Sequence, residues 1–171
     1  MKWKEAVIIM FNKDLKKNNI NYSANTNIHL AVFNEPFLSL LMDNQKTIES
    51  RFSINKIAPY GKIKQDDIVI IKKSAGPVVG YFTVGDVKFY NNLDKKDFCE
   101  IEESYGKSIG TNFDELFWEK RERANYCSLI SVSNIVKTSP YFIPKKDRSG
   151  WSLVKSTVNG NYEINEFLEC H

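Results

Sequence analysis

The sequence predicts an α+β protein, mainly β, built as a small β-barrel flanked by helices, with an extra helix at the N-terminus. Short apolar runs, several of them alternating with polar residues, dominate the middle of the chain, and Gly and Pro separate them. Helix-like segments with apolar residues three and four positions apart are few. The sequence shows neither the βα alternation nor the glycine-rich phosphate loops of doubly wound folds. A closed or nearly closed barrel therefore fits better than a doubly wound sheet.

Length and composition indicate a single soluble domain. The chain has 171 residues, of which 42% are hydrophobic and 26% charged, which is enough for one core and modest additions. No apolar run approaches the roughly 20 residues of a membrane-spanning helix. The apolar run from Ala6 to Phe11 is short, Glu5 precedes it, and no small-residue cleavage site follows. We therefore expect a cytoplasmic protein with no membrane partner.

The cysteines and histidines predict neither a metal site nor a disulfide framework. Cys99, Cys127 and Cys170 are widely spaced, and the only histidines are His29 and His171. Zinc sites usually need paired ligands at close spacing, which this chain lacks. Cys127 lies in an apolar run and is expected to be a buried small hydrophobic residue. We expect no cofactor and no metal.

The N-terminal part is predicted to be a helix followed by a linker. Residues 3–18 carry apolar side chains at helical spacing, and the polar, Asn-rich stretch 18–27 follows. Residues 1–27 are therefore interpreted as a helix and linker, residues 28–155 as the main domain, and residues 156–171 as a C-terminal tail. Whether the helix packs on the barrel or serves a partner is left open.

The first half of the main domain is predicted to be strand, helix and strands. A strand at 28–33 precedes a helix at 35–44, in which Asn44 suits the left-handed conformation of a helix C-terminus. A strand starts at Lys46, a buried strand spans 67–73, and a long strand pair spans 78–90. Within that pair, Gly80 and Gly85 are expected to mark bulges or a bend of the barrel.

The second half is predicted to contain two helices and a strand. The first helix runs from Asp94 to Tyr105 and ends before Gly106. The second runs from Thr111 to about Arg123, with Thr111 and Asp114 as a capping-box-like pair. Its apolar stripe is Phe113, Leu116 and Phe117, and Glu119, Arg121 and Glu122 are expected to be exposed. A strand at 126–136 and a tail at 140–151 complete the domain.

One hexapeptide carries the most chemical information: Lys46-Thr47-Ile48-Glu49-Ser50-Arg51. In a strand, alternation places Glu49 and Arg51 on one face, with Lys46 at the entry. Arginine suits phosphate or a planar acceptor edge, and a neighbouring glutamate can accept from an exocyclic amine or hold the arginine in place. The alternative is an ordinary surface ion pair, worth at most about 1 kcal/mol.

A helix, a tight break and Lys-x-x-Glu-x-Arg at the start of a strand resemble the signature of ASCH domains, which belong to the PUA-like superfamily. Members usually carry a Gly two residues before the Lys, where this chain has Asn44, and both residues accept positive φ. The resemblance spans roughly residues 28 to 155. It continues in Asp66-Asp67-Ile68-Val69-Ile70, the alternating run 78–87, the strand from Tyr126 to Ile130 and the segment Arg148-Ser149-Gly150-Trp151.

This resemblance implies a PUA-like barrel with a cleft between its first helix and the sheet. Cations for phosphate and an aromatic face for an unstacked base suit RNA or a nucleotide or nucleoside ligand. A core role for Trp151 and a solvated loop at 145–148 are equally compatible with the sequence. The residues predicted to bind the ligand are Lys46, Glu49, Arg51, Lys73 (or Lys72), Ser74, Arg148 and Trp151.

Charge is distributed unevenly around this predicted cleft. Residues 44–75 carry seven Lys or Arg against three Asp or Glu, and residues 137–155 carry five against one. Residues 94–123 carry six against nine. The two basic segments would create a local positive surface if they fold side by side. The acidic helices support a weaker alternative, a protein-interaction surface that includes Glu100, Glu102 and Glu103.

The alternative function is a hydrolase of RNA or a modified nucleoside, with Lys46 and Glu49 as catalytic candidates. One group of ASCH relatives has a Lys and a Thr three residues apart and a distant Glu, and hydrolyses an acylated cytidine, with Thr as nucleophile. Here Glu49 occupies the Thr position, and Glu102 or Glu103 would stand for the distant acid. Ribonuclease activity is also associated with ASCH proteins, and Lys46, Glu49 and Arg51 can in principle act as acid, base and phosphate clamp.

Overall fold

The computed structural model describes residues 2–156. Its helices are α1 (Trp3–Lys17), α2 (Phe37–Met42) and α3 (Lys95–Ile109), and the 3₁₀ turns η1 (Thr111–Phe113) and η2 (Glu119–Arg121) follow α3. Its strands are β1 (Ile28–Phe33), β2 (Ile48–Ser53), β3 (Ile68–Lys73), β4 (Val78–Asn91), β5 (Tyr126–Tyr141) and β6 (Trp151–Lys155). The predicted C-terminal tail lies outside the described residues except for Ser156.

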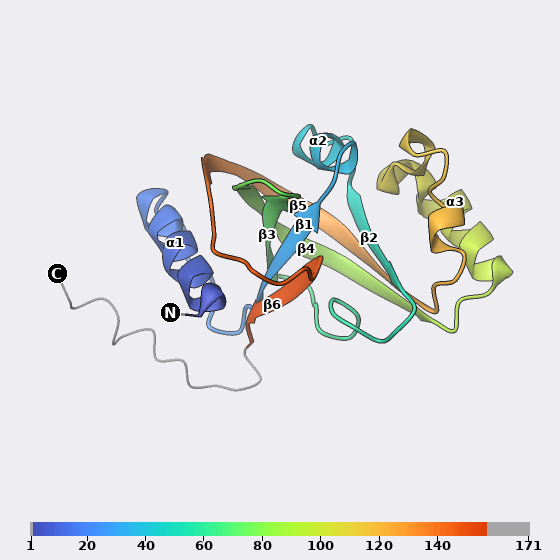
Figure 1. The fold of residues 1–171 in the computed structure, drawn as a ribbon, viewed down its shortest axis with the longest axis horizontal. Helices are drawn as coiled ribbons and strands as arrows, with labels where there is room; N and C mark the ends of the chain where they lie inside the picture. The colour runs from blue at the N-terminus through green and yellow to red at the C-terminus, as the bar shows by residue number, and fades with distance from the viewer. Residues whose placement is uncertain (1, 157–171) are drawn as a thin grey trace.

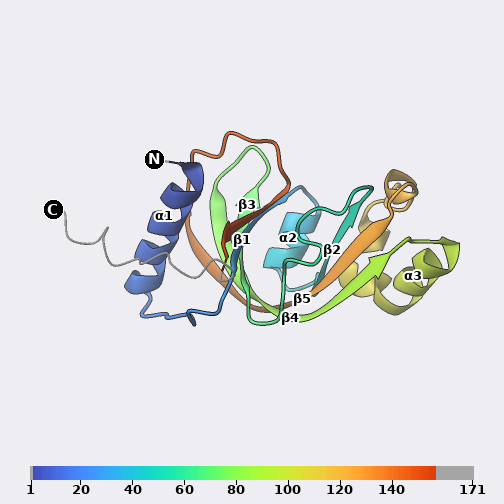
Figure 2. The same ribbon diagram turned by 90° about the horizontal axis from the view of Figure 1, so that it is seen from below.

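The strands of the described region form one sheet in the order β2-β5-β4-β3-β1-β6. β1 and β3 run parallel, and the other neighbouring pairs are antiparallel. The sheet curls into a half-barrel with α2 at one end of it, and its edge strands β2 and β6 lie on the same open side (Figures 1 and 2). The structure is therefore α+β and mainly β, with a curled half-barrel sheet flanked by helices and an extra N-terminal helix, as predicted.

The bend of the sheet is concentrated in β4, where the predicted glycines lie. The register between β4 and β5 shifts at three places, one beside Gly80 and one between Val84 and Val87, which includes Gly85. A Cβ atom at Gly80 would collide with the carbonyl oxygen of Val136 on β5. Glycine therefore permits the close approach of backbone that a bulged, strongly curled sheet requires.

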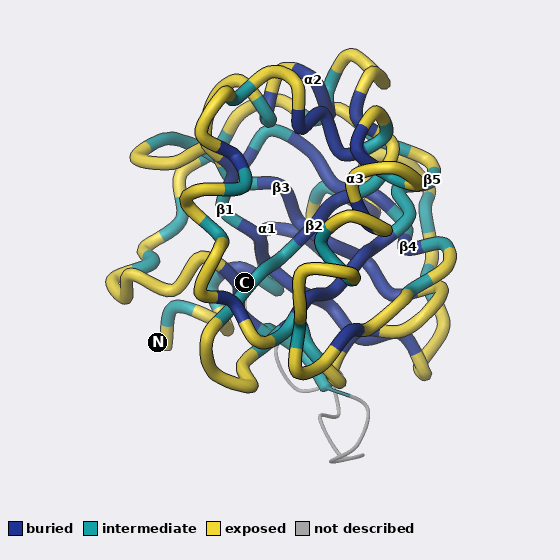
Figure 3. Tube along the Cα trace, turned by 90° about the vertical axis from the view of Figure 1, so that its right-hand side faces the viewer, coloured by how far each residue is buried: buried dark blue, intermediate teal, exposed yellow. Residues whose placement is uncertain are grey.

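Buried residues form three apolar clusters, and Figure 3 shows the burial concentrated along the strands. One cluster fills the half-barrel and includes Phe33, Phe82 and Ile130. A second lies under α1, and a third lies under α3. The second cluster contains Phe11 and its neighbours on one face of α1, so this helix packs on the barrel. Burial of each such side chain contributes about 1.5–3 kcal/mol.

α3 is longer than predicted. It continues through Gly106 to Ile109, whereas the sequence prediction ended it before Gly106. Gly106 is buried inside the helix, and a Cβ there would lie 2.7 Å from a carboxylate oxygen of Glu102. Gly110, with φ of 85°, supplies the left-handed end of the helix. The earlier glycine thus serves close packing, and the later one ends the helix.

The predicted helix from Thr111 to Arg123 was wrong. This stretch contains η1 and η2 with an extended Asp114 between them, at φ −137° and ψ 103°. The Thr111 hydroxyl donates to Glu102 of α3, 2.8 Å from Oε2, and so does not form the predicted cap. Phe113 and Leu116 are half exposed, and only Phe117 is buried. We call residues 111–121 the η segment.

The remaining differences concern where elements begin and end. α2 is shorter than the predicted helix 35–44, but Asn44 is left-handed as predicted, with φ of 58°. β2 begins at Ile48, so Lys46 precedes the strand. β4 is one continuous strand, and β5 extends past Val136 to Tyr141. Within residues 2–156, no helix is both long enough and apolar enough to cross a membrane.

Candidate functional site

The molecule has a cleft of about 460 Å³. One wall is formed by β2, the end of β1 and the start of α2, and the other wall by the η segment. It is lined by Val32, Phe33, Asn34, Glu35, Pro36, Phe37, Lys46, Glu49, Ser50, Arg51, Phe52, Phe113, Asp114, Phe117, Lys120 and Arg121. Lys46, Glu49 and Arg51 of the predicted motif therefore face one cavity.

The turn after α2 places Lys46 at the bottom of this cleft. The left-handed Asn44 reverses the chain, and the N–H groups of Gln45 and Lys46 both donate to the carbonyl of Leu40. The Lys46 side chain then points inward and is only 3% exposed. Its Nζ donates to the carbonyl of Ile109 at 2.8 Å and lies 3.3 Å from Oε2 of Glu49. Burial lowers the pKa of Lys46, and the carboxylate of Glu49 partly offsets that shift.

Glu49 joins the two cations of the motif. Its Oε1 accepts from Nε of Arg51 at 2.6 Å, while its Oε2 faces Lys46. The residue is 4% exposed, so this pairing takes place largely away from water. The motif is therefore a mutually paired triad, in which Lys46 and Glu49 are buried and Arg51 is partly buried, and not the exposed ion pair that the sequence also allowed.

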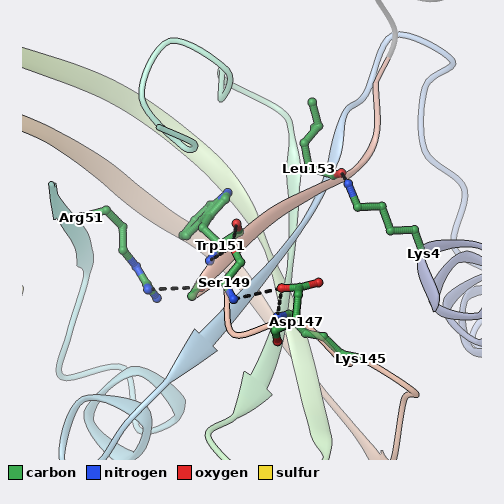
Figure 4. A network of polar contacts seen from close by, with 8 residues as sticks. Lys4, Arg51, Lys145, Asp147, Ser149, Trp151 and Leu153 are labelled. Carbon is green, nitrogen blue, oxygen red and sulfur yellow. Dashed lines mark hydrogen bonds and ion pairs between the residues drawn. The ribbon is translucent and has the colours of Figure 1, made fainter. Parts of the chain in front are cut away.

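Arg51 bridges the open side of the half-barrel. From β2 it donates through Nη2 to the carbonyl of Val32 on β1 at 3.0 Å, and through Nη1 to the carbonyl of Gly150 at 3.3 Å. Its Cζ lies 5.1 Å from the ring centroids of both Phe33 and Trp151. Figure 4 shows the side chain reaching toward the turn that precedes β6. Side-chain contacts here connect the two edges of the sheet, which share no backbone ladder.

The wall formed by the η segment carries a second set of charges. Nζ of Lys120 pairs with Oδ2 of Asp114 at 2.9 Å, and this lysine side chain is 57% exposed. The guanidinium of Arg121 stacks on Phe117, with Cζ 3.7 Å from the ring centroid, and Nη1 donates to the carbonyl of Phe117 at 2.7 Å. Partial burial lowers the pKa of Arg121, and the carboxylates of Asp114 and Glu49 partly offset this effect.

The arrangement of the elements matches solved structures. An ASCH protein from Zymomonas mobilis superposes with a TM-score of 0.57 at 10% identity, over 78% of this chain and 90% of that chain. The chain has an ASCH-domain fold. A variant of the same protein gives a TM-score of 0.56 at 11% identity, over 78% of this chain and 92% of that chain. A protein from Enterococcus faecalis V583 gives 0.51 at 13% identity, over 79% of this chain and 94% of that chain. No family model and no curated protein sequence matches.

Four of the predicted ligand-binding residues do not line the cleft: Lys73, Ser74, Arg148 and Trp151. Lys73 is the last residue of β3, and the N–H of Ser74 donates to the carbonyl of Phe33 at 2.9 Å. Arg148 is exposed in the connection between β5 and β6. Lys72, the alternative to Lys73, donates to the carbonyls of Lys73 and Gly76.

Trp151 is buried and contacts Arg51 from inside the half-barrel. It is 5% exposed, and its Nε1 donates to Nδ1 of His29 at 3.1 Å. Because Nδ1 accepts, Nε2 of His29 carries the proton and donates to Asp67 at 3.1 Å. Asp67 also accepts from the backbone N–H groups of Asn27 and Lys64. The hydrogen bonds from Trp151 through His29 to Asp67 fix the indole ring beside which the Arg51 guanidinium lies. The spacing of these residues in the sequence did not predict this chain of hydrogen bonds.

The two basic segments of the sequence meet beside this network. Arg51 of the first contacts Gly150 of the second, and burial and the nearby charge of Lys145 both lower the pKa of Lys72. Lys145 is in turn paired with Asp147 at 2.6 Å (Figure 4). Of the cations in these two segments, Lys46 and Arg51 line the cleft, and none of residues 137–155 does.

The residues considered for catalysis or metal binding are placed as follows. Glu102 lies outside the cleft lining and accepts from Thr111 and from Nε1 of Trp118 at 2.8 Å, so it anchors the η segment to α3. Cys127 is buried as predicted, while Cys170 and His171 lie outside the described residues. In residues 2–156, no group of three or more His, Cys, Asp and Glu side chains is arranged to hold a metal ion.

Sequence reasoning missed the η segment as a wall of the site. The predicted helix placed Arg121 on a solvent-facing surface, but it is partly buried in the cleft. The one available signal was composition, because residues 113–121 combine three aromatic residues with two cations. Such a mixture is typical of surfaces that bind nucleic acids.

Proposed function

We propose that this chain binds RNA or a nucleotide in the cleft between β2 and the η segment. One observation carries the proposal: aromatic rings and cations line the same cavity. Five phenylalanines and four Lys or Arg residues contribute to its lining. Unstacked bases bind aromatic rings, and phosphates attract guanidinium and ammonium groups. The volume of about 460 Å³ also falls in the range of small-molecule sites.

Both walls of the cleft offer contacts to the base of a nucleotide. Phe113 is 50% exposed at the cleft, so one ring face is available for stacking with a base. Each oxygen of Glu49 accepts from one cation of the motif and retains a further lone pair. A base that reaches the bottom of the cleft can therefore donate an exocyclic amine to Glu49, while its phosphate stays near the cations.

Binding of a labelled, short single-stranded RNA tests the proposal, with anisotropy measured at about 50 mM and about 200 mM salt. We expect salt-sensitive binding by the parent protein. Asn34→Trp fills the cleft, because Asn34 is exposed and lines it, and should abolish binding. Asn55→Trp places the same bulk at an exposed residue outside the lining and should leave binding unchanged.

Two results would contradict this assignment. Equal affinities for the parent protein and Asn34→Trp would mean that RNA binds elsewhere on the molecule. If the parent protein binds neither RNA nor any of the four ribonucleoside monophosphates, the fold is retained here for another ligand.

A second candidate, a hydrolase acting on RNA or a modified nucleoside, is favoured by the environment of Lys46. A buried lysine whose pKa is lowered by desolvation and which faces a carboxylate is a candidate base or activator. Product analysis of the binding samples checks this: turnover by the parent protein should disappear in Lys46→Met. Persistent turnover in that variant would remove Lys46 from any catalytic role, and absence of product in the parent would leave binding as the function.

A further inference from the structure

The four cations that line the cleft are not equivalent. Lys46 and Arg51 share Glu49, and Lys120 is paired with Asp114. Arg121 has no ion pair with a carboxylate anywhere in residues 2–156, although it lies in the same cavity. A partly buried guanidinium loses hydration, and here that loss is offset by contacts with Phe117 and Phe52 and in part by the nearby carboxylates of Asp114 and Glu49, neither of which forms an ion pair with Arg121. Among the four cations of the cleft, Arg121 is therefore the one whose guanidinium can still form an ion pair with an anion of a ligand.

Arg121 is held in place before any ligand arrives. Its Cζ stacks 3.7 Å from the ring centroid of Phe117 and lies 5.8 Å from that of Phe52. Nη1 donates to the carbonyl of Phe117, so one of the five N–H groups of the guanidinium fixes its orientation. Other N–H groups remain for two oxygens of one anion, in the planar fork that matches phosphate. An ordered cation of this kind loses little side-chain entropy on binding.

We propose that Arg121 binds the phosphate group of the nucleotide or RNA, and that the phosphate contact is thus made by the η segment and not by the Lys46–Glu49–Arg51 motif. This inference rests on the proposed function and names the residue that recognises the charged part of the ligand. The Asp114 and Glu49 carboxylates are close enough to raise the pKa of Arg121, so they also limit how much negative charge this position accepts. A phosphate monoester or a single backbone phosphodiester fits better than a polyphosphate.

The proposed phosphate contact and the exposed ring both belong to the η segment. Arg121 comes from η2 and Phe113 from η1, and both line the cleft. Glu102 of α3 holds the segment from behind through Thr111 and Trp118. The spacing between the stacked base and the bound phosphate is therefore set by a segment that is tied to α3 rather than by a free loop.

Calorimetric titration with the four ribonucleoside 5′-monophosphates and the four matching nucleosides measures the contribution of the phosphate. In the parent protein, we expect the preferred nucleotide to bind at least about tenfold more tightly than its nucleoside, as a charge-assisted hydrogen bond allows. In Arg121→Gln, which keeps part of the stem over Phe117, the two affinities should come within about threefold of each other. Arg123→Ala, at an exposed arginine two residues away, is the matched control and should keep the parent ratio.

Short RNAs with and without a 5′-phosphate show which phosphate is bound. Loss of affinity in Arg121→Gln for the phosphorylated RNA alone assigns a terminal phosphate, and an equal loss for both RNAs assigns a backbone phosphate. Arg121→Lys keeps the charge without the fork and should give an intermediate ratio, which provides a second test if Arg121→Gln unfolds.

The result that would overturn the inference is an unchanged nucleotide-to-nucleoside ratio in both Arg121 variants. If the parent protein still binds nucleotides in the cleft, that result would remove only the role of Arg121. Failure of the parent protein to bind any nucleotide, nucleoside or RNA would instead contradict the proposed function, and the inference with it.

Discussion

The two walls of the cleft hold their charges in different ways. On the β2 wall, Lys46 and Glu49 are at most 4% exposed, and each charge of the triad has a partner within it. On the wall of the η segment, Lys120 is largely exposed and Arg121 has no carboxylate partner within the described residues. Buried and mutually satisfied charges contribute to one fixed geometry, whereas an ordered cation without an anion is available to a ligand. The two walls therefore differ in how their charges are paired, and the proposed function predicts different roles for them.

Arg51 shows why a family-like motif does not by itself mark the ligand contact. Its guanidinium donates to Glu49 and to two carbonyls across the open side of the barrel, and it lies beside two aromatic rings. Most of its hydrogen-bonding capacity is used to hold β2 near β1 and β6. A binding defect after its removal would therefore not distinguish a lost contact from a distorted cleft.

The largest expected difference between the walls is in stability. Glu49→Gln removes the anion shared by the buried Lys46 and the partly buried Arg51 and should lower the free energy of unfolding by about 3–5 kcal/mol. Asp114→Asn breaks the corresponding pair on the other wall, where Lys120 is exposed, and should cost at most about 1 kcal/mol. Urea unfolding of both variants measures the difference. Similar losses in the two variants would mean that the walls are not energetically distinct.

The next effect concerns the closure of the barrel. Arg51→Ala removes three hydrogen bonds made by a charged group and should lower the free energy of unfolding by about 2–3 kcal/mol. Arg51→Lys cannot reach three acceptors with a planar fork, so it should recover less than half of this loss. Arg148→Ala, at an exposed arginine, should stay within about 0.5 kcal/mol of the parent protein in the same urea titration.

A smaller effect, on binding alone, is expected at the exposed ring of the η segment. Phe113→Ala should weaken binding of the preferred nucleotide by about 1–3 kcal/mol, the usual contribution of a base stacked on an aromatic ring. Leu116→Ala is the matched control, because Leu116 is 51% exposed in the same segment but does not line the cleft. Equal affinities for the two variants would exclude Phe113 as the stacking ring, and thermal unfolding should be nearly unchanged in both.

The smallest expected effect is a dependence of the free energy of unfolding on pH, caused by Lys46 in the β2 wall. The pKa of Lys46 is lowered from 10.5 in the folded protein, so above that lowered pKa the unfolded chain binds more protons at this site. The contribution of Lys46 to the free energy of unfolding should therefore rise with pH up to about 10.5. The difference in the free energy of unfolding between the parent protein and Lys46→Met, measured at increasing pH up to about 10.5, gives this contribution of Lys46. A difference that falls as pH rises would show that the lysine is stabilised in its charged form.

The sequence predicted the β2 wall because local pattern determines it. The left-handed Asn44 and the alternation of Glu49 and Arg51 follow from residue type and strand period, whereas Lys46, predicted to start the strand, precedes it. β1 was predicted with its observed ends, and the fold class and its ASCH resemblance agree with the structure.

The η segment could not be predicted in the same way, because contacts with α3 override its local pattern. Phe113, Leu116 and Phe117 have helical spacing, but Thr111 and Trp118 donate to Glu102, and Asp114 is extended. These contacts place Arg121 in the cleft. The hydrogen bond between His29 and Trp151 joins residues 122 positions apart, so no local signal could reveal it either.

The most direct test of the difference between the walls is to follow the Nε–H resonances of the arginine side chains by NMR during titration with the preferred nucleotide. The Arg121→Gln and Arg51→Lys variants assign the two signals. We predict that the Arg121 resonance shifts with saturation, while that of Arg51, already bonded to Glu49 at 2.6 Å, changes little. A saturating shift at Arg51 with no change at Arg121 would contradict the account, because the ligand would then be held by the motif of β2 and not by the η segment.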